Sequence, residues 1–212
     1  MPTFLVVLDV DSTLIEQEAI ELLAAEAGSL DTVAAITSRA MAGELDFAAS
    51  LTERVATLEG LEMDALARVA PRITLTPGAS ELVAGVHAAG GMIGVVSGGF
   101  HELLDPLASQ LGLDRHRANR LESEHGRLTG RTAGTIIDAE AKAESLRKWA
   151  AEAGIPLHRT VAVGDGANDL AMMAAAGLAI AFDAKPLVRE HAHVCLDERD
   201  LSAVLAALGL RG

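Results

Sequence analysis

Two acidic residues come directly after the first apolar run of the chain, and their spacing suits phosphoryl transfer. The run FLVVL is followed by Asp9 and Asp11, and then by Ser12 and Thr13. The carboxylate of Asp9 can attack phosphorus and form an acyl phosphate, which divides one difficult displacement into two easier ones. Asp11 lies two residues further along an extended segment, so we expect it on the same side. There it can protonate a poor alkoxide leaving group and later deprotonate water.

A second segment offers groups that bind phosphate. Ser97, Gly98 and Gly99 follow the apolar run MIGVV and precede a helical pattern. A hydroxyl and backbone amides at the start of a helix are suitable donors to phosphate oxygens. Lys142, in the pattern DAEAKAESL, adds a fixed positive charge for the nucleophile and the phosphoryl group. Phosphoryl transfer depends mostly on positioning and on stabilising charge, which these groups supply.

A third segment suggests a metal ion. The motif GDGAND after the run TVAVG places Asp165, Asn168 and Asp169 between a buried strand and a helix. Carboxylates that gather at one place repel one another unless a cation lies among them. A set of oxygen ligands without histidine or cysteine favours Mg²⁺ over zinc. We therefore expect magnesium between Asp9, Asp165 and a phosphate oxygen.

Short apolar runs alternate with helical patterns along most of the chain. FLVVL, MIGVV, TVAVG, LAIAF and HVCL lack polar alternation, which is typical of strands buried on both faces. The longer segments between them have helical spacing. We predict an α/β fold with a doubly wound parallel sheet, a Rossmann-like core formed by residues 1–14 and 75–212. Ligands bind at the carboxyl ends of the strands in such sheets, which is where the polar motifs fall.

One stretch breaks this alternation. Residues 15–74 contain helical patterns and no convincing strand, and we predict a small all-helical cap inserted after the first strand. Its expected helices are Glu16–Ala27, Asp31–Met41, Phe47–Leu58 and Met63–Val69. A further segment, RANRLESEHGRLTGRT, has apolar residues on both sides of His125-Gly126 and predicts a β-hairpin.

Composition excludes several partners. The formal net charge of −13 repels nucleic acid and anionic membranes, and it also repels a phosphorylated substrate unless a metal or individual cations compensate locally. No apolar run is long enough to span a bilayer, and the first residues lack the cationic start of a signal peptide. The single cysteine, Cys195, can form no internal disulfide and is expected to be a buried thiol. These features predict a cytoplasmic protein, either monomer or homodimer.

The motifs resemble those of a known family. DVDSTLIEQEAIELLA, VVSGGF, the lysine in EAKAESL, and VGDGANDLAMMAAAG are similar to the four motifs of the haloacid dehalogenase superfamily. The segments MAGELDFAASLTERV and IAFDAKP extend the resemblance to the phosphoserine phosphatases within it, from Phe4 to about Leu205. The resemblance implies hydrolysis of O-phospho-L-serine to L-serine and phosphate, the last step of serine biosynthesis.

The resemblance also implies a role for individual residues. Asp9 would be the nucleophile and Asp11 the general acid and base, and Mg²⁺ would be held by Asp9, the Asp11 main-chain carbonyl and Asp165, with Asp169 outside them. The residues implied to bind the phosphate are Ser97, Gly98, Lys142 and Asn168. In the cap, the implied contacts are Glu18 with the substrate ammonium, Arg54 with its carboxylate, and Met41 and Phe47 closing the lid.

Other functions remain open at this point. The chain has the motifs that another small-metabolite phosphatase of the same superfamily would have. A phosphoacceptor signalling module also places acids, a hydroxyl and a lysine at strand ends and forms an aspartyl phosphate, although the helical insertion and the GDGAND motif disfavour it. A protein that only binds its ligand is a third alternative, disfavoured because each catalytic position holds a competent residue.

Overall fold

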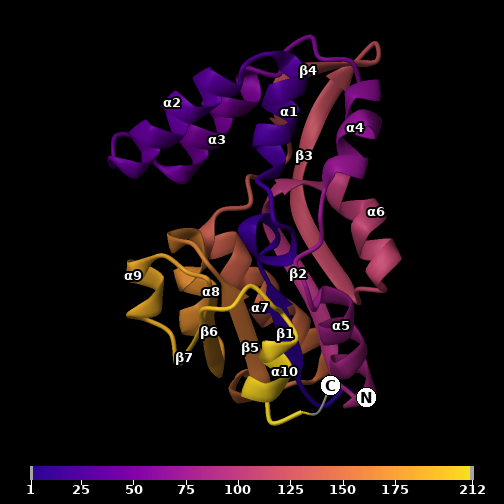
Figure 1. Ribbon diagram of the computed structural model, residues 1–212, viewed down its shortest axis with the longest axis vertical. Coiled ribbons are helices and arrows are strands. Elements are labelled where there is room, and N and C mark those ends of the chain that lie inside the picture. The colour runs from indigo at the N-terminus through magenta and orange to yellow at the C-terminus, as the bar shows by residue number, and fades with distance from the viewer. Residues whose placement is uncertain (1, 211–212) are drawn as a thin grey trace.

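The computed structural model describes residues 2–210, and its centre is a seven-stranded sheet in the order β4-β3-β2-β1-β5-β6-β7 (Figure 1). All neighbouring strands are parallel except β3 and β4. The predicted doubly wound α/β fold is therefore confirmed. The strands are β1 (Leu5–Leu8), β2 (Met92–Phe100), β3 (Arg115–Glu124), β4 (Arg127–Ala133), β5 (Thr160–Gly164), β6 (Leu178–Phe182) and β7 (Val194–Leu196).

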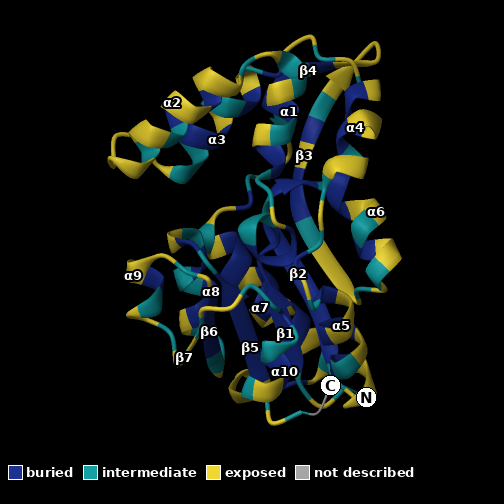
Figure 2. Cartoon of the chain, viewed as in Figure 1, coloured by how far each residue is buried: buried dark blue, intermediate teal, exposed yellow. Residues whose placement is uncertain are grey.

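The sheet is covered on both faces, which explains its uninterrupted apolar strands. Leu5 and Val7 of β1 belong to a hydrophobic cluster with helices α7 (Ala139–Ala153), α8 (Leu170–Ala175) and α9 (Pro186–Arg189). Val6 and Leu8 point the other way, into a cluster with α5 (Ala79–Ala88), α6 (His101–Leu111) and α10 (Ala203–Ala207). Successive residues of a strand face opposite sides, so both must be apolar when both sides are covered. Figure 2 shows the central strands buried and the outer helix faces exposed.

Four helices follow β1, within the segment predicted to be helical. They are α1 (Ala19–Ala27), α2 (Leu30–Met41), α3 (Phe47–Ala56) and α4 (Asp64–Val69). They lie beyond the carboxyl ends of the strands (Figure 1). Their buried residues form a third cluster, which Leu121 of β3 and Leu128 of β4 complete. The helices thus rest on the β3–β4 hairpin as well as on the core.

The hairpin is confirmed, and its geometry follows from its turn. His125 and Gly126 both have positive φ, 50° and 78°. Two successive residues of this kind match the twist of antiparallel strands in a tight hairpin. Its first strand joins the main sheet beside β2, so the hairpin extends the sheet rather than standing apart.

Two expectations about individual elements are wrong. Strand β2 runs on to Phe100, beyond the predicted end at Val96, so Ser97 lies inside the strand rather than after it. Cys195 is exposed rather than buried. It lies on β7, the last strand of the sheet, which has a neighbour on one side only. The apolar pattern of HVCL does not show that this strand is at an edge.

None of the helices in residues 2–210 combines the length and the apolar character that crossing a membrane requires.

The packing of α7 against the sheet predicts a stability effect. Leu146 is fully buried in the cluster beneath α7, so Leu146→Ala is expected to lower the free energy of unfolding by about 2–5 kcal/mol. Leu187→Ala, at a half-exposed leucine, serves as the control and is expected to cost less than about 1 kcal/mol. Urea unfolding of the three proteins measures both values. Equal losses for the two variants would contradict this view of the core.

Candidate active site

Asp9 is held at the end of β1 by contacts on both its backbone and its side chain. Its backbone N–H donates to the carbonyl of Val163 on β5 at 3.0 Å. Its carboxylate accepts from the N–H of Val10 at 2.7 Å and lies 2.6 Å from the Lys142 ammonium. Only 4% of the residue is exposed. Burial and repulsion from Asp169 raise the pKa of Asp9 well above its ordinary value, although Lys142 opposes them.

Lys142 lies between two carboxylates and is completely buried. The ammonium on α7 is 2.6 Å from Asp9 and 2.8 Å from Asp169. Burial alone would lower the pKa of Lys142, but the charges of Asp169 and Asp9 outweigh it and keep that pKa above its usual value. The lysine is therefore charged at neutral pH. It fixes the Asp9 oxygen from the interior of the protein, which leaves the rest of the carboxylate for other partners.

Asp165 completes a group of acids that can hold a metal ion. Carboxylate oxygens of Asp9, Asp165 and Asp169 lie within 4.8 Å of one another. Burial and the charge of Asp169 raise the pKa of Asp165 to about 6. Three carboxylates with one lysine leave two negative charges, and all the donors are oxygens. This donor set fits a hard divalent cation.

The oxygens of Asp169 are already in use. One is bound to Lys142, and the other accepts from the N–H of Gly166 at 3.1 Å. Asp165 instead accepts a longer bond, 3.3 Å, from the hydroxyl of Thr13. Asp165 is thus the freer ligand, in keeping with the expectation that Asp169 stands outside the metal's own ligands.

Asp11 faces the site from a wide turn formed by Val10–Leu14. Asp11 itself has extended backbone angles, φ −64° and ψ 133°, and the next residue, Ser12, has a φ of 57°. The Asp11 carboxylate accepts from the N–H of Ala19 at 2.7 Å and from the Ser97 hydroxyl at 3.0 Å. Burial and the nearby charge of Glu18 raise the pKa of Asp11 to about 6. A carboxyl group in this range can exchange a proton near neutral pH, as a general acid and base must.

The Ser97–Gly99 segment, a bulge near the end of β2 that we call the phosphate turn after its expected ligand, lies against Asp11 and the helical segment. The Ser97 hydroxyl accepts from the N–H of Gly99 at 2.7 Å while it donates to Asp11. A Cβ added at Gly98 would lie 2.7 Å from the ring of Phe47 on α3. The absence of a side chain at Gly98 therefore lets the helices approach the phosphate turn closely.

A cavity of about 740 Å³ joins these groups to the helical segment. Nine of the residues expected in the site line it: Asp9, Asp11, Glu18, Met41, Phe47, Arg54, Gly98, Asp165 and Asn168. Ser97 and Lys142 are buried and are not among the residues that line it, but they contact Asp11 and Asp9, which do. Met41 is 76% exposed at the end of α2, so it lies at the mouth rather than in the interior.

Glu18 and Arg54 provide opposite charges on the wall of this cavity. Glu18 accepts from the Ser12 hydroxyl at 2.8 Å. Arg54 donates to the carbonyl of Ser50 at 3.3 Å and, within residues 2–210, has no carboxylate within ion-pair distance. Burial lowers the pKa of Arg54, and the charges of Glu18 and Asp11 oppose that shift. A partly buried guanidinium without an ion pair is prepared for an anionic ligand.

One residue of the site was not expected: Lys185 lines the cavity. Thr13, which was expected at this strand end without a stated role, contacts Asp165. The charge of Lys185 lowers the pKa of Asp165, against the larger effect of burial, and its N–H donates to the Asp165 carbonyl at 3.1 Å. Lys185 follows the strand LAIAF, so the rule that polar residues gather at the carboxyl ends of strands would have indicated it.

The sequence matches the model of the haloacid dehalogenase-like hydrolases over residues 6–174. This chain belongs to that family. The expected resemblance is therefore confirmed, and the chain is a hydrolase by family.

Several relatives of this haloacid dehalogenase-like hydrolase are named phosphoserine phosphatase. One from Streptomyces coelicolor is 54% identical over 206 residues, which are 97% of this chain and 50% of the relative. One from Streptococcus thermophilus is 50% identical over 96% of this chain and 95% of its own length. The chain thus spans half of the first relative and nearly all of the second.

Solved structures agree with these relatives. A phospho-aspartyl intermediate analogue of phosphoserine phosphatase superposes with a TM-score of 0.92 at 43% identity, covering 98% of this chain and 99% of the other. A substrate-bound phosphoserine phosphatase has the same TM-score at 42% identity and the same coverage.

The raised pKa of Asp11 predicts a pH-dependent stability effect. Its pKa is about 6 in the folded protein against an ordinary 3.8, so the folded state binds this proton more tightly. The carboxyl group therefore destabilises the fold increasingly as pH rises from about 4 to 6, and fully above 6. Asp11→Asn should then raise the melting temperature at pH 7.5 in EDTA, with a gain that shrinks toward pH 4.

Thermal unfolding across this pH range measures the effect. Asp64→Asn, at an exposed acid on α4, is the matched control and should show no gain of this kind. An Asp11→Asn protein less stable than the parent at pH 7.5 would show that the carboxylate is not strained.

Proposed function

We propose that this chain is a magnesium-dependent phosphoserine phosphatase that hydrolyses O-phospho-L-serine to L-serine and phosphate. The observation that carries the proposal is one cavity lined by two chemically different sets of groups. Asp9 and Asp11 are the acids for the chemistry, and Glu18 and Arg54 add a pair of opposite charges to the same lining. The relatives and solved structures named phosphoserine phosphatase support the same substrate.

Asp9 is the nucleophile in this proposal. Its buried carboxylate, held on one oxygen by Lys142, attacks phosphorus and forms an aspartyl phosphate. The serine oxygen leaves with the proton of Asp11. Asp11, now ionised, takes a proton from a water molecule, which attacks the aspartyl phosphate and regenerates Asp9. The raised pKa of Asp11 supports both halves of this exchange.

The acids at the strand ends are the proposed metal ligands. Asp9, Asp165 and the Asp11 main-chain carbonyl would hold Mg²⁺, with Asp169 fixing the surroundings through Lys142 and Gly166. When bound, the ion supplies positive charge to the phosphate oxygens and helps to align the attack. The proposed phosphate contacts are Ser97, Gly98, Lys142 and Asn168.

The helical segment, residues 15–74, is the proposed substrate-selecting lid. Serine carries an ammonium and a carboxylate, and the cavity wall offers Glu18 for one and Arg54 for the other. Phe47, in contact range of Gly98, and Met41 at the mouth would cover the bound substrate. Another small-metabolite phosphatase would not need this pair of charges.

We place the reaction in the cytoplasm as the last step of serine biosynthesis. A lone cysteine, which can form no internal disulfide, is in keeping with a reducing compartment. Whether the chain acts as a monomer or a homodimer stays a prediction.

Asp9→Asn tests the proposed chemistry. An amide cannot form the acyl phosphate, so phosphate release in Mg²⁺ is expected to fall by about 10³-fold or more. Mass spectrometry of trapped parent protein should find the phosphoryl group on Asp9 alone. EDTA should abolish release, and excess Mg²⁺ should restore it.

The control for this experiment is Asp31→Asn, at an exposed acid of α2, which should keep the parent rate. Normal turnover in the Asp9 variant, or a label on another side chain, would refute the mechanism.

Arg54→Ala tests the substrate. Loss of a charged hydrogen bond to the substrate carboxylate is expected to raise KM for phosphoserine by about 10–100-fold. O-phosphoethanolamine has the same ammonium and phosphate without the carboxylate, so its kinetics should change little. Steady-state phosphate release measures both substrates.

Arg68→Ala removes another arginine of the helical segment, which pairs with Glu26 away from the cavity, and should leave both substrates unaffected. An equal effect of Arg54→Ala on the two substrates would reject the assignment of Arg54 to the carboxylate.

A further inference from the structure

The backbone ladder between β2 and β3 is interrupted beside the phosphate turn. Val96 is paired with Arg117, and the next pair is Phe100 with Asn119. Three residues of β2, Ser97–Gly99, therefore lie opposite one residue of β3. Their backbone groups lose the regular ladder partners at this bulge and must be satisfied in another way.

The side chain of Asn119 replaces one of the missing ladder bonds. Its Nδ2 donates to the carbonyl of Gly98 at 2.8 Å, and its Oδ1 accepts from the N–H of Ile137 at 2.8 Å. Only 2% of Asn119 is exposed. A carbonyl on one side and an N–H on the other allow a single orientation of the amide group. Both ends of the side chain are thus committed to backbone partners.

These two bonds connect separate parts of the site. The carbonyl of Gly98 and the N–H of Gly99 belong to one planar peptide unit. Asn119 binds the oxygen of that peptide unit. The N–H of the same unit, from Gly99, donates to the Ser97 hydroxyl, which in turn donates to Asp11. On the other side, Ile137 immediately precedes Asp138, whose carboxylate caps α7, the helix that carries Lys142.

We propose that Asn119 is a positioning residue that sets the orientation of the Gly98–Gly99 peptide and its spacing from α7. The inference rests on the proposed function only in taking Ser97–Gly99 as the phosphate-binding turn. A shift of this peptide changes the donors presented to phosphate and the hydrogen bond that Ser97 makes to Asp11. Asn119 itself touches neither the cavity nor the acids.

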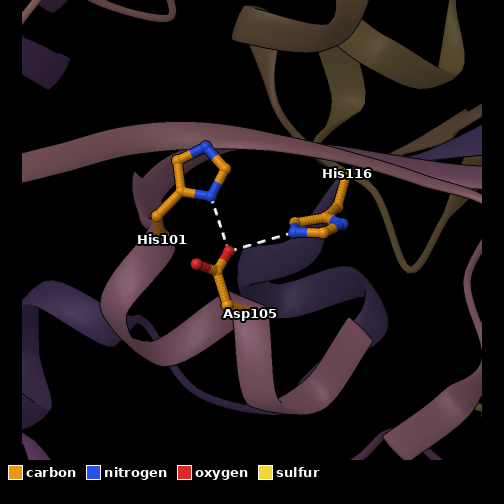
Figure 3. Close-up of side chains that lie close together, drawn as sticks. All are labelled: His101, Asp105 and His116. Atoms are coloured by element: carbon orange, nitrogen blue, oxygen red, sulfur yellow. Dashed lines mark hydrogen bonds and ion pairs between the residues drawn. The ribbon is translucent and has the colours of Figure 1, made fainter. Parts of the chain in front are cut away.

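A cluster of side chains joins α6 to β3 directly after the same turn. Figure 3 shows His101, Asp105 and His116, with both rings directed at one carboxylate oxygen, at 2.7 Å and 3.0 Å. The other ring nitrogen of His101 accepts from the N–H of Ala118 at 3.1 Å. His101 begins α6 directly after the turn, so the cluster anchors that helix to β3.

The same bonds argue against a metal ion in this cluster, although its donor atoms lie within 4.8 Å of one another. For Nδ1 of His101 to bind a metal, its proton must move to Nε2. Nε2 would then carry an N–H directed at the N–H of Ala118, and the hydrogen bond between them would be lost. The three side chains satisfy one another, and their part is to hold the strand that carries Asn119.

Asn119→Asp separates the two bonds of the side chain. An aspartate keeps the acceptor for the N–H of Ile137 but loses the donor to the Gly98 carbonyl. Asn119→Ala removes both bonds without burying a charge. Thr160→Val is the matched control. Thr160 is also buried, and its hydroxyl also donates to a backbone carbonyl and accepts from a backbone N–H. It lies at the start of β5, at the end of the sheet opposite to the site.

The kinetic readouts are kcat and KM with p-nitrophenyl phosphate, together with inhibition by inorganic phosphate. These ligands have no amino-acid part, so the result does not depend on phosphoserine being the substrate. Both Asn119 variants are expected to lower kcat by about tenfold or more and to weaken phosphate inhibition. Thr160→Val should lower the melting temperature by a similar amount and leave kcat within about twofold of the parent.

Variants of Asn119 that lose stability but keep kcat and phosphate inhibition within twofold of the parent would overturn the proposal. So would a Thr160→Val protein with the same kinetic loss, because the effect would then follow stability alone. Assays run well below the lowest melting temperature keep the comparison among folded proteins. Failure of the proposed function would show instead as a parent protein that hydrolyses p-nitrophenyl phosphate but not phosphoserine.

Discussion

The site depends on one fully buried ammonium group shared by two carboxylates. A lysine with no exposure to solvent stays charged only when its partners are in place, and the carboxylates tolerate burial for the same reason. Removing one partner of such a group typically costs about 3–5 kcal/mol, since it leaves an uncompensated charge in the interior. This ion-pair network therefore links the end of β1, the GDGAND segment and α7, in addition to the apolar packing between them.

The remaining charges of the site follow from this arrangement. The whole chain is strongly acidic, and Lys142 is already shared by Asp9 and Asp169. In the proposed function, the attraction for a phosphorylated ligand would therefore come from a divalent cation and from cations placed individually, such as Lys185 at the cavity wall. Local charge, rather than the sign of the whole surface, determines what can bind.

Much of the fold could be predicted because both faces of the sheet are covered. Buried strands then appear as unbroken apolar runs, and the acids that follow them converge at one edge, as Asp9 and Asp165 do. The apolar runs do not reveal the order of the strands in the sheet, so the exposure of Cys195 on an edge strand was not predicted. The surroundings of Asp11 depend on the wide turn formed by Val10–Leu14, which no periodicity reveals. Asn119 was missed because its partners are backbone groups, which every residue has.

The length of β3 affects how the helical segment can move. This strand begins in the main sheet and runs on to the helical segment, where Leu121 joins the cluster of the helices. Strand β3 thus connects the core to the helical segment, in addition to the two chain connections after β1 and before α5. A tilt of the helices would therefore bend β3, including the residues of β3 that pair with β2 beside the phosphate turn. In the proposed lid function, opening of the cavity at Met41 would thus be coupled mechanically to the geometry around Asp11 and Ser97.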